Sequence, residues 1–320
     1  MPCAWPCLAW RPNEHGSYPA MNESTITDQA QRKIAFRTRG QGDGFITRLM
    51  SPSDLGQVLK PFVFLDIFQA DRRMIQAMSS GGGMPIHPHS GIATITVFTE
   101  GRMRFEDPAN GSGVIAYGGV EWMRAGGGVW HGKEMTPDDV DRIQGFQLWI
   151  TLPRELENAE PESRYIEADD MRRAGPAHVI VGCHEGEQSP VPAPEGVNYL
   201  LVTLKSGESW TYAPPAGHMV AWLALAKGSL ETGSGISAGE MISFENGDAP
   251  ILLQATGNED AVFVLGSAVP HPYDLHMGSY SVHTSTEALV AGERRIAELG
   301  MRLRKAGDRR TQSGTTPVFR

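Results

Sequence analysis

Three histidines and one glutamate stand out in this sequence as ligands for a metal ion. His87-Pro88-His89 follows one glycine-rich run, and His131 and Glu134 follow a second such run further along the chain. Imidazole nitrogens and a carboxylate oxygen form a mixed ligand set that suits a divalent first-row metal. Four such ligands leave positions of an octahedral ion open for a small molecule. The pattern therefore predicts a metal centre that can bind a substrate.

The spacing of the first two histidines fits a β-strand. Residues two apart on a strand point to the same face, so His87 and His89 are expected to direct both rings into one barrel interior. Pro88 lacks an N–H group and indicates an edge or an irregular strand start. The alternative is that these are structural or surface histidines. Two histidines in register, with a third in another glycine-rich turn, favour the metal site.

The elements that must position these residues are short β-strands. Many short strands with turn signals between them predict barrels or sandwiches. The β-rich runs lie at residues 62–65, 93–98, 114–117, 146–150, 178–181, 199–204, 219–225, 251–254 and 261–265. Helical periodicity is clear only over residues 287–305, where Thr284 or Ser285 can cap the helix.

The strands fall into two sets that resemble a weak internal repeat. The second set has no His-x-His pair, and His218 stands alone in it. We therefore expect two barrels, one with a metal and one without. The predicted units are a disordered extension (1–34), an N-terminal metal-binding barrel (35–166), a C-terminal barrel without metal (177–283), a helix (284–305) and a tail (306–320).

Composition restricts the class of protein. A chain of 320 residues with 40% hydrophobic content suits a soluble globular protein of one large or two medium domains. The net charge of −9 argues against direct nucleic-acid binding, which needs a basic surface. No apolar run approaches the roughly 20 residues that a membrane span needs. The acidic balance leaves room for a protein partner but identifies none.

Cysteine usage favours a cytoplasmic protein. Cys3, Cys7 and Cys183 form no disulfide framework, and the first two lack partners for a structural zinc site. A reducing compartment is therefore expected. The first residues are apolar, but they are broken by proline and lack a basic region, so they do not fit a signal peptide. Met21 is an alternative start of the functional chain.

The motifs around the histidines resemble those of the pirins, which are bicupin proteins of the cupin superfamily. The pirin pattern His-Pro-His-Arg-Gly-Phe-Glu-Thr-Val-Thr corresponds to residues 87–96, His-Pro-His-Ser-Gly-Ile-Ala-Thr-Ile-Thr. The pattern Gln-Trp-Met-Thr-Ala-Gly-x-Gly-Ile-x-His corresponds to residues 121–131, and Gln-Leu-Trp-Val-Asn-Leu-Pro to residues 147–153. The resemblance covers roughly residues 35–305. It implies an all-β fold of two tandem cupin (jelly-roll) β-barrels with a C-terminal helix.

The resemblance also implies a ligand set. Pirins carry iron on three histidines and one glutamate, which points to His87, His89, His131 and Glu134 here. One divalent metal is expected, with Fe(II) first and Mn, Co, Ni, Cu or Zn as alternatives.

The position of Glu134 departs from the family pattern. The family's glutamate follows the third histidine by two residues, whereas Glu134 follows His131 by three. On a regular strand this shift turns the side chain to the opposite face. A bulge at Gly132 would restore its direction. The alternative places Lys133 near the metal and leaves three histidines alone as ligands.

The resemblance implies a function, but not a single one. Some bacterial pirins resemble quercetin 2,3-dioxygenases, so we expect a metal-dependent dioxygenase that acts on a flavonol-like or other small aromatic substrate. Glu134 would then accept the substrate's phenolic proton as a general base. Phe62, Phe64, Phe98, Trp122 and Trp130 are candidates for stacking on that substrate, and a place in the hydrophobic core is the alternative for each of them. Ser90 and Ala93 replace the Arg and Glu of the first motif, so substrate preference is not copied from other pirins.

Two alternatives to the enzyme stay open. Eukaryotic pirins act as transcriptional co-regulators, which implies a non-enzymatic protein that binds other proteins according to the oxidation state of its iron. A cupin that has lost its metal is the other alternative.

Overall fold

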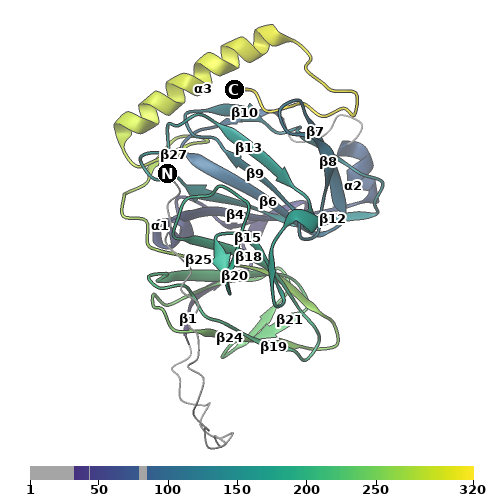
Figure 1. The fold of residues 1–320 in the computed structure, drawn as a ribbon, viewed down its shortest axis with the longest axis vertical. Helices are drawn as coiled ribbons and strands as arrows, with labels where there is room; N and C mark the ends of the chain where they lie inside the picture. Colours follow the sequence, from purple (N-terminus) through teal and green to yellow (C-terminus); the bar gives the residue numbers. More distant parts are fainter. Residues whose placement is uncertain (1–31, 43, 79–84) are drawn as a thin grey trace, which may run out of the picture.

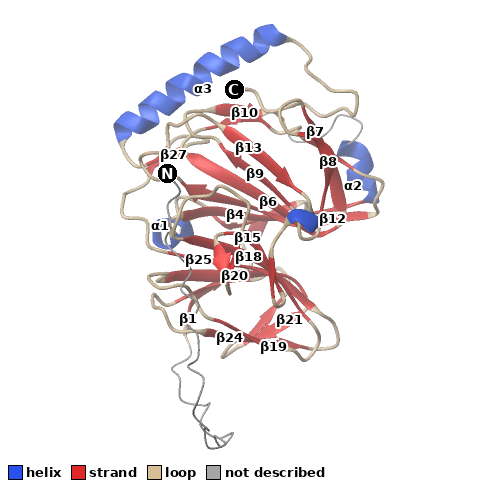
Figure 2. Cartoon of the chain, viewed as in Figure 1, coloured by secondary structure: helices blue, strands red, loops and turns tan. Residues whose placement is uncertain are grey.

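The computed structural model describes residues 32–42, 44–78 and 85–320 and has the predicted all-β fold, two stacked β-barrels with one long C-terminal helix (Figures 1 and 2). The expected disordered extension falls outside the described residues up to position 31, as do Cys3, Cys7 and Met21. Within the described ranges, no helix is both long and apolar enough to cross a membrane.

The first barrel is built on an antiparallel sheet of seven strands. Its order is β13 (Glu162–Ile166), β9 (Val120–Arg124), β6 (Ile92–Glu100), β12 (Arg142–Thr151), β4 (Phe62–Asp71), β3 (Ile46–Met50) and β2 (Gln41–Gly42). Two smaller sheets complete the barrel: β11 (Met135–Pro137), β7 (Arg102–Asp107) and β8 (Gly111–Ala116) in one, and β10 (Val129–His131) with β5 (His87–His89) in the other. Two short helices, α1 (Leu55–Leu59) and α2 (Arg72–Ala77), flank β4.

The second barrel repeats this plan. Its seven-stranded sheet has the order β1 (Ile34–Thr38), β23 (Met241–Phe244), β20 (Val220–Lys227), β25 (Ala261–Ala268), β18 (Val197–Leu204), β15 (Ala177–Val181) and β14 (Arg173–Ala174). A four-stranded sheet faces it: β19 (Ser209–Tyr212), β24 (Ile251–Thr256), β21 (Ser229–Glu231) and β22 (Gly235–Ser237). The remaining elements are a 3-10 turn at Ala168–Asp170 and two hairpins, β16 (Cys183–His184) with β17 (Glu187–Gln188) and β26 (His276–Met277) with β27 (Val282–His283).

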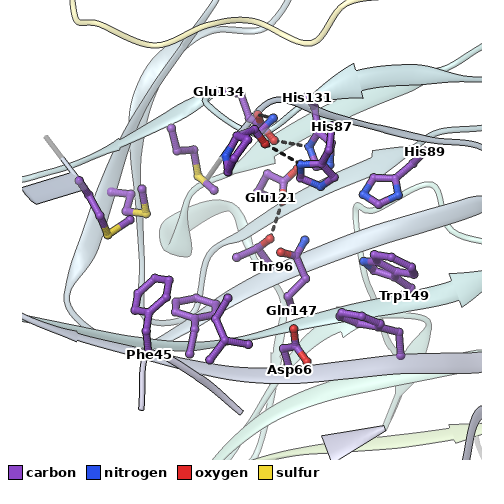
Figure 3. Close-up of a pocket in the computed structure, with 18 of the residues that line it drawn as sticks. Phe45, Asp66, His87, His89, Thr96, Glu121, His131, Glu134, Gln147 and Trp149 are labelled. Carbon is purple, nitrogen blue, oxygen red and sulfur yellow. Dashed lines mark hydrogen bonds and ion pairs between the residues drawn. The ribbon is translucent and has the colours of Figure 1, made fainter. Parts of the chain in front are cut away.

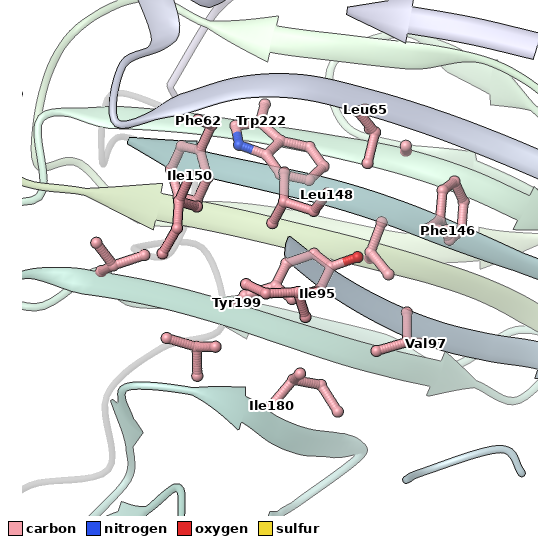
Figure 4. Packing of buried hydrophobic residues seen from close by; sticks show 14 of the residues in the cluster. Phe62, Leu65, Ile95, Val97, Phe146, Leu148, Ile150, Ile180, Tyr199 and Trp222 are labelled. Carbon is pink, nitrogen blue, oxygen red and sulfur yellow. The ribbon is translucent and has the colours of Figure 1, made fainter. Parts of the chain in front are cut away.

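The two large sheets pack against each other face to face. Phe146 and Leu148 of β12 are fully buried in a cluster that also contains Tyr199 and Trp222 of the second sheet (Figure 4). Because side chains alternate along a strand, the opposite face of each sheet lines its own barrel. In the second barrel that face is filled by a separate apolar cluster, which includes Leu223. In the first barrel it lines a pocket.

Segments from both ends of the described chain cross to the other barrel. Strand β1 pairs with β23, so residues 34–38 join the second sheet. Ile34 lies in the range predicted as a disordered extension, and residues 35–38 lie at the start of the range predicted for the first barrel. After the second barrel, the chain returns to the first through β26, β27 and helix α3 (Thr286–Ala306), which lies over β5 and β10 (Figure 1). The ranges 35–166 and 177–283 remain our proposal for the two domains, with β1 exchanged between them.

The last residues complete this return. Trp130 and Phe319 exchange backbone hydrogen bonds, and the N–H of Thr316 donates to the carbonyl of Lys133 at 2.5 Å. The indole N–H of Trp130 donates to the carbonyl of Ile296 in α3 at 2.8 Å. The C-terminal segment therefore pairs with β10, the strand that carries His131, along the edge away from β5.

Candidate metal centre

The paired strands β5 and β10 bring the three predicted histidines together. Their register places His131 opposite His87 and Val129 opposite His89. One nitrogen from each of the three rings lies within 4.8 Å of the other two. Figure 3 shows the three imidazoles grouped at one side of the pocket. A two-stranded ribbon thus joins residues that lie far apart in the sequence.

Hydrogen bonds to the outer ring nitrogens fix how these imidazoles can bind. Nδ1 of His87 is 2.9 Å from the carbonyl oxygen of Pro85, and Nδ1 of His89 is 2.9 Å from that of Tyr280. Nδ1 of His131 is 2.6 Å from a carboxylate oxygen of Glu134. Carbonyl and carboxylate oxygens only accept, so each Nδ1 carries the proton. In the neutral form of each ring, Nε2 therefore keeps its lone pair for a metal.

Burial keeps two of the rings neutral. His89 is 1% exposed, and burial lowers its pKa well below the ordinary value, with a further contribution from the neighbouring imidazoles. Burial also lowers the pKa of His87. Neutral imidazole is the form that binds metal, so both rings are ready to bind near neutral pH without losing a proton.

The residues present fit a metal ion. Nε2 of His131 is buried and has no hydrogen-bond partner among the described residues. A buried polar nitrogen without a partner is costly, because it has lost its contact with water. A cation held between the three Nε2 atoms would remove that cost. Nitrogen donors of this kind suit Fe, Ni, Cu or Zn.

Glu134 lies beside His131 and is buried. Its Oε1 accepts from His131, and its Oε2 accepts from the backbone N–H of Gly132 at 2.7 Å. Burial raises the pKa of this carboxyl group, but His131 and the N–H donors outweigh burial and bring the pKa to about 2. Burial lowers the pKa of His131, but the Glu134 carboxylate more than offsets this and raises it. Glu134 is thus an anion that orients the third imidazole.

The loop after His131 decides between Glu134 and Lys133. Gly132 has φ +138°, a conformation that side-chain-bearing residues rarely adopt. Glu134 lines the pocket, whereas Lys133 is not among the described residues that line it. The carbonyl of Lys133 is bonded instead to the C-terminal tail. The direct coordination of a metal by Glu134 stays a prediction, because its two oxygens are engaged by His131 and Gly132 here.

The pocket in front of the histidines is large and mostly apolar. Its volume is about 810 Å³. The rings of Phe64 and Trp149 stack at 4.0 Å, and the guanidinium of Arg48 lies 3.9 Å from the Phe64 centroid. Other aromatic and thioether side chains complete the apolar wall: Phe45, Phe68, Phe98, Met74, Met78, Met103 and Met135.

Only part of the expected aromatic lining is present. Phe64 and Phe98 line the pocket, but Phe62 and Trp122 are buried in the cluster between the two large sheets. They lie on the opposite face of their strands, because the side chains alternate. Trp130 packs under α3. Trp149 and Phe45 line the pocket instead.

Glu121 is a pocket residue that the sequence analysis did not single out. It lies on β9 and is 2% exposed, and its Oε2 accepts from the Thr96 hydroxyl at 2.6 Å. Its position next to Trp122 could have indicated this. Trp122 packs in the core between the large sheets, and successive side chains on a strand point to opposite faces, so Glu121 faces the pocket. Glu121 also stands where the second pirin motif has Gln.

A cluster of buried polar side chains lies next to the end of β5 and consists of Ser90, Glu157, His283 and Thr284. Ser90 Oγ lies 3.0 Å from Nε2 of His283, and Nδ1 of His283 lies 3.2 Å from Oε2 of Glu157. Both carboxylate oxygens of Glu157 also accept from Thr284, at 2.7 Å each. A Cβ at Gly292 of α3 would come within 2.5 Å of Ser90 Oγ, so the helix covers the serine closely. The chain of contacts Ser90–His283–Glu157 resembles the Ser-His-acid arrangement of hydrolases, but all three side chains are buried from solvent. The cluster therefore fixes the position of Ser90, the residue next to His89.

Comparison with known proteins agrees with these motifs. The model of the pirin family matches residues 45–150. A pirin-like protein of Caulobacter vibrioides is 42% identical over 126 residues, which cover 39% of this chain and 44% of that protein. A Pseudomonas aeruginosa protein provisionally named a quercetin 2,3-dioxygenase is 30% identical over 234 residues, which cover 70% of this chain and 81% of that protein.

Solved structures show the same fold. A quercetin 2,3-dioxygenase from Acinetobacter baumannii superposes with a TM-score of 0.69 at 21% identity, over 87% of this chain and 99% of that chain. The bacterial pirin YhhW from Escherichia coli, in complex with nickel(II), has a TM-score of 0.55 at 18% identity, over 75% of this chain and 98% of that chain. Both the sequence relatives and the shared bicupin fold lead to one conclusion: the chain belongs to the pirin family.

Proposed function

We propose that this protein is a metal-dependent dioxygenase that acts on a flavonol-like or other small aromatic substrate. The observation that carries the proposal is the group of three imidazoles at an aromatic-walled pocket of about 810 Å³. Relatives from Pseudomonas aeruginosa and Vibrio cholerae are provisionally named quercetin 2,3-dioxygenases, which supports the same class of reaction.

We propose that His87, His89 and His131 hold one divalent metal, with Glu134 beside them. Fe(II) is our first candidate, and the nickel(II) complex of the Escherichia coli pirin supports a test of nickel as well. Mn, Co, Cu and Zn are the other candidates. When bound, the metal would supply a Lewis acid that organises the substrate's hydroxyl oxygen and O₂ for reaction.

The protein's own groups would orient the substrate and exclude water. Trp149 and Phe45 line the pocket and would contact an aromatic ring, and the pocket walls are mostly apolar. A substrate that fills this space would displace water from the front of the imidazoles. Glu134 would keep the His131 ring in the orientation that binds metal. The predicted role of Glu134 as proton acceptor requires that it first release His131.

The experiment is oxygen uptake by protein loaded separately with each candidate metal, in the presence of a panel of flavonols. We expect uptake with at least one metal and its loss in His89→Ala. The matched control is His276→Ala, a histidine outside the pocket that contacts Thr286. If no metal supports uptake with any flavonol, the proposal fails, and the alternative of an iron-redox-responsive protein that binds a protein partner is favoured.

A further inference from the structure

Glu121 lines the pocket, and one of its carboxylate oxygens is a hydrogen-bond acceptor without a partner among the described residues. Thr96 satisfies its Oε2, but its Oε1 is buried and has no hydrogen-bond partner among the described residues. A carboxylate oxygen that is buried without a donor lowers the stability of the folded protein. Such an arrangement indicates a place where a ligand, rather than the protein, supplies the donor.

The other carboxylates that line the described part of the pocket are already engaged. Both oxygens of Asp66 accept from the guanidinium of Arg48, one of them at 3.1 Å. Both oxygens of Glu134 accept from His131 and Gly132. In this part of the structure, Glu121 is therefore the pocket carboxylate with an oxygen left for a ligand.

The position of Glu121 relates this acceptor to the metal centre. In the view of Figure 3, Glu121 and Thr96 lie between the imidazoles and the opposite wall with Asp66. Glu121 is also close enough to His131 and Glu134 for their charges to influence it. A group bound at its free oxygen would thus lie in the pocket that the three histidines also line.

We propose that Oε1 of Glu121 accepts a hydrogen bond from a hydroxyl group of the substrate, and so selects aromatic ligands that carry a hydroxyl group over those that lack one. The inference rests on the proposed function, because it assigns the substrate's hydroxyl to a residue of the same pocket. Apolar walls alone discriminate weakly between a hydroxylated ring and its parent. A charged acceptor in a buried site discriminates strongly, by about 10-fold to 100-fold.

The protonation state of Glu121 sets the conditions of the test. Burial, with the charge of Glu134, raises the pKa of this carboxyl group to about 7, against the opposing effects of Thr96 and His131. Above that pH the free oxygen is ionised and can only accept. Binding should therefore be measured at about pH 8, one unit above the pKa.

The test compares 3-hydroxyflavone with flavone, which has the same rings without the hydroxyl. Both are titrated by calorimetry into the full chain, without oxygen, first as purified and then after removal of metal by a chelator. Metal removal matters because a metal would itself prefer the hydroxylated compound. The variants are Glu121→Gln, which keeps the shape and removes the charge, and Glu121→Leu, which removes the acceptor. Asp66→Asn is the matched control, since both Asp66 oxygens are engaged.

We expect the metal-free wild-type chain to prefer 3-hydroxyflavone by about 10-fold or more. Both Glu121 variants should lose most of that preference while their affinity for flavone stays the same, and Asp66→Asn should keep the preference. If the Glu121 variants prefer 3-hydroxyflavone as the wild type does, the inference is wrong and the proposed function stands. If the wild type binds neither compound in either form, both the inference and the proposed function fail.

Discussion

Removal of the Glu134 carboxylate should weaken both the fold and the metal centre. In Glu134→Ala, Nδ1 of His131 and the N–H of Gly132 lose acceptors that lie at 2.6 and 2.7 Å. Each buried donor left without a partner costs about 1–3 kcal/mol, so the metal-free protein should lose about 2–6 kcal/mol of its free energy of unfolding. Glu134→Gln keeps one amide oxygen as an acceptor and should lose about half as much.

The effect on metal binding follows from the orientation of His131. Loss of a partner that orients a metal-binding histidine typically weakens metal affinity by about 10-fold to 100-fold. This corresponds to about 1.4–2.8 kcal/mol of binding free energy. If Glu134 also coordinates the metal directly, as the family pattern predicts, its removal should cost more than this range, and X-ray absorption should show one oxygen ligand fewer.

The assays are urea unfolding of the metal-free protein and competition with a chelator of known affinity. Lys133→Ala is the control. Lys133 is adjacent to Glu134 in the sequence, but it is not among the described residues that line the pocket. Unchanged stability and unchanged metal affinity in Glu134→Ala would refute the reasoning. A large effect of Lys133→Ala alone would favour the alternative in which Lys133 approaches the metal.

Three further predictions follow from buried polar groups. Glu157→Ala leaves three buried donors without their acceptor, so the free energy of unfolding should fall by at least about 3 kcal/mol. Urea unfolding measures this loss, and a value under about 1 kcal/mol would contradict the role of the cluster. His89→Ala should reduce the metal content from about one equivalent to near zero by elemental analysis, with His276→Ala unaffected, and retained metal would argue against His89 as a ligand. Burial lowers the pKa of His178 and His218 from 6.5 to about 4, so the unfolded chain takes up protons first as the pH falls. Stability should therefore decline between about pH 6.5 and 4, and a constant urea midpoint over that range would exclude this linkage.

The local patterns of the sequence predict the features of the fold that depend on neighbouring residues. Short β-rich runs such as residues 146–150, separated by turn signals, predict strands, and the structure places a strand there. The His-x-His spacing predicts two rings on one face, and His87 and His89 both line the pocket. The second glycine-rich motif predicts that His131 joins them, which depends on the family resemblance more than on spacing.

Features that depend on distant pairing could not be predicted in this way. Nothing in residues 34–38 indicates that they pair with β23, because either large sheet offers an open edge to such a strand. The stacking role was wrong for Phe62 and Trp122 for a related reason, and the alternative place in the hydrophobic core is confirmed for both. Alternation defines two faces of a strand, but both faces are buried here, one against the second barrel and one in the pocket. Composition alone cannot tell these faces apart.

The return of the C-terminal segment to the first barrel has a consequence for biosynthesis. The carbonyl that holds the His89 ring belongs to Tyr280, and the strand that carries His131 is bonded to Phe319. A ribosome makes the three histidines early and the residues that support them last. If these histidines bind a metal as we propose, firm binding should begin only after residues 280–319 have been made. A shortened chain that ends before Tyr280 would contain all three histidines but would lack the backbone groups that support them. We expect it to bind a metal more weakly than the full chain does.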